Sequence, residues 1–226
     1  MAAVSPLPLA HPEALSPHSH AALGALARCP FAAEAYLAGS AALALYTGHR
    51  PVRDLDLMSA ANRLTGPERR DVLGELRAAD PETTVETARD GYLYVRLAGG
   101  VGVRTFYYPY PLVDPEQEID GVAVASAVDL GLMKLAAIIS RGERRDFVDL
   151  YLLGQRLPLA GLLERAEEKF GHVGDFPLQA LKALADLSAA ADQPLPKLAR
   201  PLAWSEVESW LADEVRTLGR AHVGLR

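Results

Sequence analysis

The chain has 226 residues, half of them hydrophobic, and its 23 basic and 29 acidic residues give a formal net charge of −6, which disfavours non-specific, counterion-driven attachment to nucleic acid. This length and apolar content suffice to bury a substantial core, so we expect one compact domain or two small lobes. The single cysteine excludes an internal disulfide framework, the N-terminus lacks the basic and apolar regions of a secretory signal, and no apolar run approaches the roughly 20 residues that span a bilayer, so we expect a cytoplasmic protein without a membrane partner.

The first half of the chain is predicted to mix helices and strands. After a proline-rich start, residues 12–28 are rich in Ala and Leu and predict a helix. Residues 36–38 predict the end of a strand and residues 40–46 a helix, which places Gly39 and Ser40 at the N-terminus of that helix. Free backbone amides and the positive end of the helix dipole favour an anion such as phosphate there. The pair also has a purely structural interpretation, because glycine permits tight turns and serine caps helices.

The segment from Arg53 to Met58 alternates charged or polar residues with apolar ones. This period predicts a strand with Asp54 and Asp56 on one face and leucines buried beneath them. Two carboxylates spaced i, i+2 can hold the same ion, and oxygen ligands of this kind suit Mg²⁺. An Asp-x-Asp on a strand is otherwise usually solvated surface, so it is the combination with the preceding Gly-Ser pair that indicates a nucleotide site.

The region that follows predicts one more helix and then three strands. Thr65 and Glu68 have capping-box spacing, and the helix is expected to run to about Ala79. The strands are predicted over residues 83–87, 92–97 and 101–108, the first two joined as an antiparallel meander. We therefore expect an α+β fold with a small mixed sheet and helices packed against it.

From Ser126 onward the sequence is predicted to be almost wholly helical. A capping-box-like start at Ser126 is followed by further helices near residues 160–170, 177–190 and 206–219, with proline-containing linkers between them. We expect two parts, a core of residues 1–125 and an all-helical C-terminal lobe of residues 126–226.

A charged stretch inside the helical lobe places Lys134 and Asp149 on either side of Gly142. In one unbroken helix the two charged residues would lie about 22 Å apart. A break at Gly142 would let the two halves fold back as a hairpin and bring Lys134 level with Asp149. Lys134 could then neutralise triphosphate charge, and Asp149 could act near an attacking hydroxyl or help to hold metal and substrate. The alternative is a helix–helix salt bridge between the two, with Asp146 as a first-turn acid that complements the helix dipole.

Two blocks of sequence resemble known families. Gly39-Ser40, a spacer and Asp54-Leu55-Asp56 resemble the signature of the nucleotidyltransferase superfamily that shares its catalytic fold with DNA polymerase beta. The stretch from Lys134 to Tyr151, with the order Lys, Arg, Arg-Asp-x-x-Asp-Leu-Tyr, resembles the motif of the AbiEii/AbiGii toxin family, which includes the MenT toxins. The two blocks together span residues from about 36 to 153.

The resemblance implies a polymerase beta-like sheet with flanking helices, followed by a helical lobe that contributes Lys134 and Asp149 to the site. It further implies Mg²⁺-dependent transfer of a nucleoside monophosphate from a nucleoside triphosphate to an acceptor, with release of pyrophosphate. The protein would be the toxin of a toxin–antitoxin pair, with a cognate antitoxin protein as partner and tRNA 3′ ends or other RNA as one acceptor. Two alternatives stay open: the same chemistry on a protein or small-molecule hydroxyl, and a non-catalytic member that binds nucleotide or a partner.

The resemblance also assigns roles to individual residues. Asp54 and Asp56 are expected to hold the metal, and Lys134 and Asp149 to complete the catalytic set. The residues expected to bind the nucleotide and its phosphates are Gly39, Ser40, Arg53, Arg141, Arg145 and Asp146.

One residue departs from the superfamily pattern. Its third carboxylate generally comes from a later strand, and the alternation of residues 102–107 predicts Thr105 at that position. A threonine hydroxyl cannot replace a charged metal ligand or a strong base. We therefore expect an incomplete three-acid site, in which either Asp149 takes over the duty or the enzyme is slow or inactive.

Overall fold

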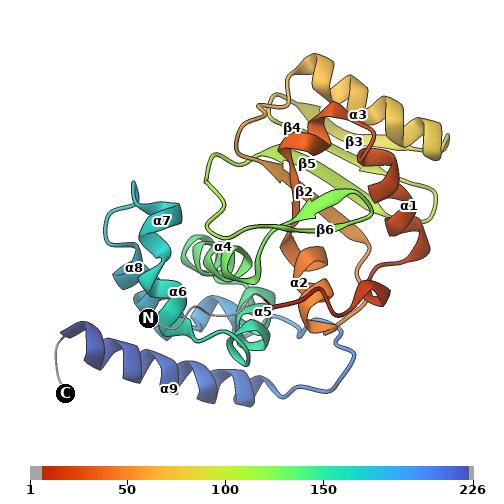
Figure 1. Cartoon of the computed structure of the whole chain (residues 1–226). Coiled ribbons are helices and arrows are strands. Elements are labelled where there is room, and N and C mark those ends of the chain that lie inside the picture. The colour runs from red at the N-terminus through yellow and green to blue at the C-terminus, as the bar shows by residue number, and fades with distance from the viewer. Residues whose placement is uncertain (1–6, 224–226) are drawn as a thin grey trace. The chain divides into compact units, whose positions relative to one another are not determined.

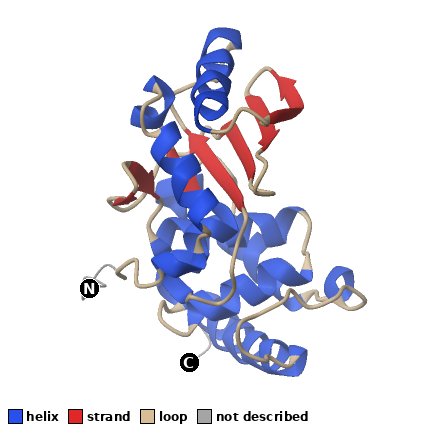
Figure 2. Ribbon diagram, turned by 90° about the vertical axis from the view of Figure 1, so that its right-hand side faces the viewer, coloured by secondary structure: helices blue, strands red, loops and turns tan. Residues whose placement is uncertain are grey.

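The computed structural model describes residues 7–223, and the chain divides into two compact units, Met1–Ser126 and Ala127–Arg226 (Figure 1). All strands of the described residues belong to the first unit, and the second consists of helices and loops (Figure 2). The mixed α+β architecture predicted from the sequence is confirmed. No helix in residues 7–223 combines the length and apolar character needed to cross a membrane.

The first unit is built on a mixed sheet of seven strands in the order β3-β4-β5-β2-β1-β7-β6. The strand β2 lies near the middle, antiparallel to β1 and parallel to β5, and β4 continues the sheet antiparallel to β5. The bounds are β1 Tyr36–Ala38, β2 Asp54–Ser59, β3 Thr84–Arg89, β4 Tyr92–Arg96, β5 Gly102–Tyr107, β6 Gln117–Ile119 and β7 Val122–Val124.

Alternation along the central strands separates a buried face from an open one. Leu55 and Leu57 of β2 are fully buried, as are Val95 of β4 and Thr105 of β5. The residues between them on each strand face the other side and are half-buried or exposed, apart from the buried Gly102 and Met58. The two-residue period that predicted these strands therefore holds, and it leaves polar side chains of β2, β4 and β5 together on the open face.

Helices of the first unit are α1 (Pro17–Leu26), α2 (Gly39–Thr47) and α3 (Gly66–Ala79). The single helix expected over residues 12–28 is instead a short 3₁₀ turn (Pro12–Ala14) followed by α1. Ser16 accepts a hydrogen bond from the Ser19 amide, and Pro17 occupies the first helical position, so the helix begins there. The expected capping box at Thr65 and Glu68 is present at the start of α3.

The hairpin of β6 and β7 was missed by the sequence analysis. Its turn is formed by Asp120 and Gly121, both with positive φ. An Asp-Gly pair next to a short apolar run is a hairpin signal, so the sequence carried part of the information. The strands have only three residues each, which left too little alternation to detect.

The second unit contains α4 (Ala127–Ser140), α5 (Arg144–Gly154), α6 (Leu159–Glu164), α7 (Ala166–Phe170), α8 (Phe176–Ala185) and α9 (Trp204–Val223), the blue helix of Figure 1. Gly142 has φ +57° and separates α4 from α5, so the predicted break and helical hairpin are confirmed. The helices α5 and α9 contact each other through an edge-to-face aromatic pair, Tyr151 and Trp210, whose ring centroids lie 5.5 Å apart.

Candidate active site

Two carboxylates stand next to each other on the open face of β2. Asp54 and Asp56 are separated by the buried Leu55, and their side chains are 45% and 22% exposed. The predicted arrangement, two acids on one face with leucines beneath, is therefore confirmed. Both carboxylates can be reached by a ligand, and Asp56 is the more enclosed of the two.

Gly39 fits closely beneath Asp56. The strand β1 ends at Ala38, which pairs with Asp56, and α2 begins at Gly39 with φ +61°. A β-carbon at position 39 would lie 2.5 Å from Asp56 Oδ2, so the position requires glycine both for its backbone conformation and for space. Ser40 follows in the first turn of α2 and is half-buried. The predicted strand-to-helix turn thus lies directly against the carboxylate pair.

Gly102 plays the corresponding part for Asp54. It pairs with Asp54 across the parallel strands β2 and β5, and a β-carbon there would lie 2.5 Å from Asp54 Oδ1. Each carboxylate therefore has one oxygen packed over a glycine. The sequence analysis assigned no role to Gly102, because its closeness to Asp54 depends on how β5 aligns with β2.

Arg104 of β5 is a site residue that the sequence analysis missed. Its Nη1 donates to Asp56 Oδ1 over 2.9 Å and its Nη2 donates to Asp54 Oδ2 over 2.8 Å. Burial by itself lowers the pKa of this guanidinium, but the hydrogen bonds and charges of Asp56 and Asp54 outweigh that effect and raise it. Arg104 is therefore a permanent cation bound to both acids.

The expectation that Thr105 takes the place of the third carboxylate is wrong. Thr105 pairs with the buried Leu57, whereas Arg104 pairs with Asp56 and shares its face. Thr105 is fully buried, and its hydroxyl has no hydrogen-bond partner among the residues that the structure describes. The residue beside Asp56 on the neighbouring strand is thus the positively charged Arg104. Within residues 7–223, no group of three or more acidic, histidine or cysteine side chains could bind a metal ion.

A second charged cluster lies in the helical hairpin of α4 and α5. Lys134 Nζ lies 2.6 Å from Asp149 Oδ2 and 3.1 Å from Asp146 Oδ1, and both acids are fully buried. The prediction that the hairpin brings Lys134 level with Asp149 is confirmed. The salt bridge considered as an alternative to a catalytic role is therefore present, and Asp146 is a buried partner in it as well as a first-turn acid of α5.

Arg141 extends this cluster to the surface. It donates to Asp146 through Nε and Nη2, over 2.8 and 2.9 Å. Burial alone raises the pKa of Asp146, but the hydrogen bond from Arg141 and the charge of Lys134 outweigh it and hold this pKa below its usual value. The hydrogen bonds that Arg141 donates to Asp146 in turn raise the pKa of Arg141.

The remaining two predicted arginines are exposed. Arg145 lies 2.6 Å from Glu143, at the start of α5. Arg53 precedes β2, and a β-carbon at Gly100 would lie 3.7 Å from its Nη1, so it borders the turn between β4 and β5. The structure thus brings Gly39, Asp54 and Asp56 together in the first unit and Lys134, Arg141, Asp146 and Asp149 together in the second.

Comparison with known protein families agrees with this geometry. The family model described as "Nucleotidyl transferase AbiEii toxin, Type IV TA system" matches residues 21–206, which is most of the chain. The chain belongs to the AbiEii nucleotidyl transferase toxin family. Both charged clusters lie inside the matched range. Membership implies a nucleoside triphosphate substrate and an antitoxin partner for this nucleotidyltransferase.

The AbiEii-family chain is also similar to individual proteins. It is 30% identical over 189 residues to uncharacterized protein aq_aa25 of Aquifex aeolicus, covering 80% of this chain and 86% of the relative. A solved structure from H. pylori, assigned as a nucleotidyltransferase, superposes with a TM-score of 0.55 at 19% identity, covering 91% of this chain and 93% of the other. MenT4, a nucleotidyltransferase toxin from Mycobacterium tuberculosis H37Rv, gives 0.52 at 16% identity, covering 88% and 80%. These two structures share the fold of this chain.

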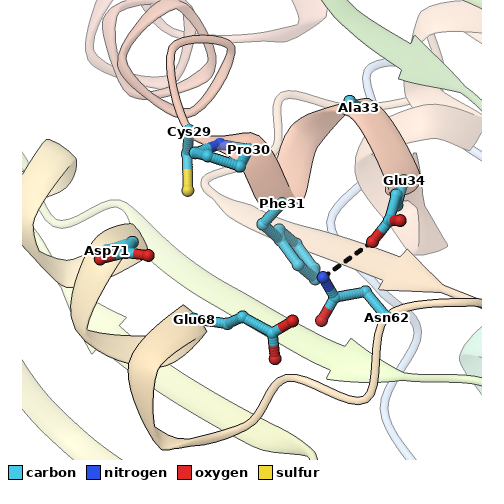
Figure 3. A pocket seen from close by; sticks show the side chains of 8 residues that line it. All are labelled: Cys29, Pro30, Phe31, Ala33, Glu34, Asn62, Glu68 and Asp71. Carbon is cyan, nitrogen blue, oxygen red and sulfur yellow. Dashed lines mark hydrogen bonds between the residues drawn. The ribbon is translucent and has the colours of Figure 1, made fainter.

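A cavity of about 290 Å³ lies elsewhere in the first unit of this AbiEii-family chain and includes none of the predicted site residues (Figure 3). Asn62 donates to Glu34 across it over 2.9 Å, and Glu68 belongs to the capping box of α3. Burial raises the pKa of the Cys29 thiol, which keeps it protonated and unreactive at neutral pH. The polar groups here serve the fold, so we assign the cavity no part in the reaction. Its lining is Cys29, Pro30, Phe31, Ala33, Glu34, Asn62, Glu68 and Asp71.

Proposed function

We propose that this AbiEii-family nucleotidyltransferase transfers a nucleoside monophosphate from a Mg²⁺-bound nucleoside triphosphate to an acceptor, with Asp54 and Asp56 as the metal ligands. The observation that carries the proposal is the pair of carboxylates on one face of β2, with Gly39 and the start of α2 packed against Asp56. A phosphate group can approach a glycine backbone at a helix N-terminus, and two carboxylates can share its counter-ion.

The residues present fit Mg²⁺. The candidate metal ligands on this face, the carboxylates of Asp54 and Asp56, bind through oxygen. Mg²⁺ typically takes one or two carboxylates, several waters and substrate phosphates. Two acids are therefore sufficient when the nucleotide supplies further oxygens. When bound, the metal would neutralise phosphate charge and polarise the reacting phosphoryl group. The chain itself would position the nucleotide through Gly39 and Ser40 and hold the two carboxylates in register.

We further propose that Lys134 and Asp149 serve the same reaction. Their ion pair is almost wholly excluded from water, since the Lys134 side chain is 10% exposed and Asp149 fully buried. The Lys134 ammonium lies on two fully buried carboxylates, so it would neutralise triphosphate charge by moving away from at least one of them. Because the same contacts also stabilise the hairpin, only variants that separate stability from turnover test this role.

RNA is the acceptor that we favour, with tRNA 3′ ends as the first candidate. An aromatic pair on the open face supports this choice. The ring centroids of Tyr92 of β4 and Phe106 of β5 lie 6.2 Å apart, on the same face as Arg104. The Arg89 guanidinium lies 5.1 Å from the Tyr92 ring. Unpaired RNA bases stack on such rings and on arginine planes. The net charge of −6 argues for a defined RNA end over broad attachment to the RNA backbone.

The deciding experiment is incubation of the purified chain with Mg²⁺, each α-³²P-labelled nucleoside triphosphate in turn, and total RNA. Asp56→Asn is the test variant and Asp90→Asn the matched control, because Asp90 lies in the turn between β3 and β4, is 99% exposed and lies 3.0 Å from Arg69. Label in a discrete RNA band, lost with Asp56→Asn and kept with Asp90→Asn, supports the proposal.

Other outcomes redirect the proposal or end it. Label on protein from a cell extract, with none on RNA, would keep the chemistry and replace the acceptor. Absence of label from RNA, protein and small molecules, while the chain still binds nucleoside triphosphate, would favour a non-catalytic nucleotide-binding member. The lack of a third carboxylate, with Arg104 beside Asp56 on the neighbouring strand, is the feature that makes this second candidate worth testing.

A further inference from the structure

Arg104 occupies one oxygen of each carboxylate in the pair. Its two terminal nitrogens donate separately, to Asp56 Oδ1 at 2.9 Å and to Asp54 Oδ2 at 2.8 Å. The planar fork of a guanidinium is suited to such double contacts, and charge-assisted hydrogen bonds of this kind are stronger than neutral ones. The Arg104 side chain is 29% exposed, so water screens the contact less than it would on the open surface.

The other oxygen of each carboxylate is packed against backbone. Asp56 Oδ2 lies over Gly39 and Asp54 Oδ1 lies over Gly102, each so close that a β-carbon would come within 2.5 Å. Each acid therefore packs against glycine backbone on one side and accepts a hydrogen bond from Arg104 on the other. A cation that bridges the two carboxylates must compete with the Arg104 guanidinium, which already bridges them.

Charge sets Arg104 and a divalent cation in competition for the two carboxylates. The pair of carboxylates carries a charge of −2, and Arg104 already supplies +1. A divalent ion placed on the same oxygens would meet a fixed positive charge, because an arginine does not deprotonate in proteins. The carboxylates thus favour either Arg104 or a metal, and each weakens the other.

Arg104 also has a partner other than the two acids. Its guanidinium carbon lies 4.9 Å from the centre of the Tyr94 ring, on the neighbouring β4 strand, where a cation–π contact supports it without a carboxylate. Triphosphate oxygens present the same bidentate geometry that the guanidinium now finds on the two acids. A nucleotide arriving on this face would therefore give Arg104 a new anionic partner.

We propose that Arg104 competes with the divalent cation for Asp54 and Asp56 and transfers to the phosphates of the nucleotide, so that metal and nucleotide bind in a mutually dependent way. This inference rests on the proposed function. By linkage, if the nucleotide draws Arg104 away and so tightens metal binding, the metal tightens nucleotide binding by the same factor. The site would take up its metal together with the substrate and hold it weakly otherwise.

The test measures two affinities of the full chain and of Arg104→Met. Binding of Mn²⁺ alone is followed by the electron paramagnetic resonance of the free ion. Binding of each α,β-methylene nucleoside triphosphate in turn is followed by calorimetry at saturating Mn²⁺. We expect Arg104→Met to bind Mn²⁺ at least about 10-fold more tightly and the analogue at least about 10-fold more weakly. A folding defect would weaken both affinities, so opposite changes cannot arise from misfolding.

Two controls accompany the variant. Arg96→Met removes a neighbouring arginine that contacts the same Tyr94 ring but pairs with Glu86, and it should leave Mn²⁺ affinity within about 2-fold. Arg104→Lys keeps the charge without the fork, and its Mn²⁺ affinity should fall between those of the wild type and Arg104→Met. It also serves as the folded comparison if Arg104→Met is unstable.

The outcomes separate this inference from the proposed function. Equal Mn²⁺ affinity in the wild type and Arg104→Met, with binding abolished by Asp56→Asn, overturns the competition and leaves the metal site standing. Unchanged analogue affinity in Arg104→Met overturns the transfer to phosphate. If neither the wild type nor Arg104→Met binds Mn²⁺, with or without the analogue, the metal-dependent function and the inference are both overturned.

Discussion

Gly39 and Asp56 approach each other so closely that a β-carbon at residue 39 would lie 2.5 Å from Asp56 Oδ2. The contact joins the start of α2 to the open face of β2, because Ala38 and Asp56 are paired across β1 and β2. The strand-to-helix turn and the acid are therefore one structural unit, and any side chain at residue 39 must displace the carboxylate or the backbone.

The first prediction is that Gly39→Ala lowers both stability and turnover. The left-handed backbone at φ +61° and the clash with Asp56 should together cost about 2–4 kcal/mol in the free energy of unfolding. Displacement of Asp56 should reduce nucleotidyl transfer by at least about 10-fold. Urea unfolding and the labelling assay measure the two effects.

Gly74→Ala is the matched control for this glycine. Gly74 lies inside α3, and a β-carbon there would meet nothing within 4 Å. The same substitution should therefore stabilise the chain by about 0.5–1 kcal/mol, because alanine favours helix more than glycine does. Unchanged stability and activity in Gly39→Ala would contradict the close fit described for this turn.

A second prediction concerns the buried hydroxyl of Thr105. Its oxygen has no hydrogen-bond partner among the described residues, so Thr105→Val should remove a desolvated polar group and raise the free energy of unfolding by about 1 kcal/mol. Turnover should stay within about 2-fold of the wild type, because the side chain faces away from Asp54 and Asp56. Thermal unfolding and the labelling assay test both statements, and a large loss of activity would return Thr105 to the site.

The difference between Thr105 and Arg104 shows what the sequence could predict and what it could not. Local alternation was enough to place Asp54 and Asp56 on one face, because that depends only on neighbours along one strand. Choosing between residues 104 and 105 requires the alignment of β5 with β2, two strands separated by a helix and another hairpin. A shift of one residue exchanges the faces, and nothing in the β5 sequence fixes that shift.

The helical hairpin was easier to predict, because its cause is local. Gly142 takes a left-handed conformation where the sequence analysis placed the break, and residues equally far from the turn then meet. The full set of contacts was not accessible in the same way. That Lys134 reaches two acids, and that Arg141 covers Asp146, follows from side-chain packing between α4 and α5.

A third prediction separates the structural and catalytic parts of the Lys134 cluster. Lys134→Met removes the cation shared by two fully buried carboxylates and should cost about 3–5 kcal/mol in the free energy of unfolding. The double variant Lys134→Met with Asp149→Asn also removes one buried charge and should recover roughly half of that loss. Urea unfolding of both variants measures the recovery.

Activity decides what the cluster is for. We expect the double variant to be stable enough to assay and to show at least about 100-fold less transfer than the wild type, because the ammonium is absent in both variants. Recovery of turnover in step with stability would contradict the catalytic proposal and leave the cluster a support of the hairpin.

The last prediction is a pH dependence that involves Asp146. The folded-state pKa of this buried acid is held below its usual value, although burial opposes the shift, because Arg141 donates to it and Lys134 lies nearby. The unfolded chain therefore binds the proton more readily. The stability that this group contributes is present above the unfolded pKa of about 3.9 and is lost as the pH falls below that value toward the folded pKa.

Arg141→Gln should weaken this dependence. Without the guanidinium the folded pKa of Asp146 rises toward the unfolded one, so the difference in the free energy of unfolding between pH 7 and pH 3 should be smaller than in the wild type. At pH 7 the loss should be of the order of 1 kcal/mol, since the Arg141 side chain is 45% exposed and water screens it. Arg145→Gln, which removes an exposed arginine paired with Glu143, is the control and should leave the pH dependence between 7 and 3 closer to that of the wild type. Equal pH dependence in Arg141→Gln and the wild type would show that Lys134 alone sets the pKa of Asp146.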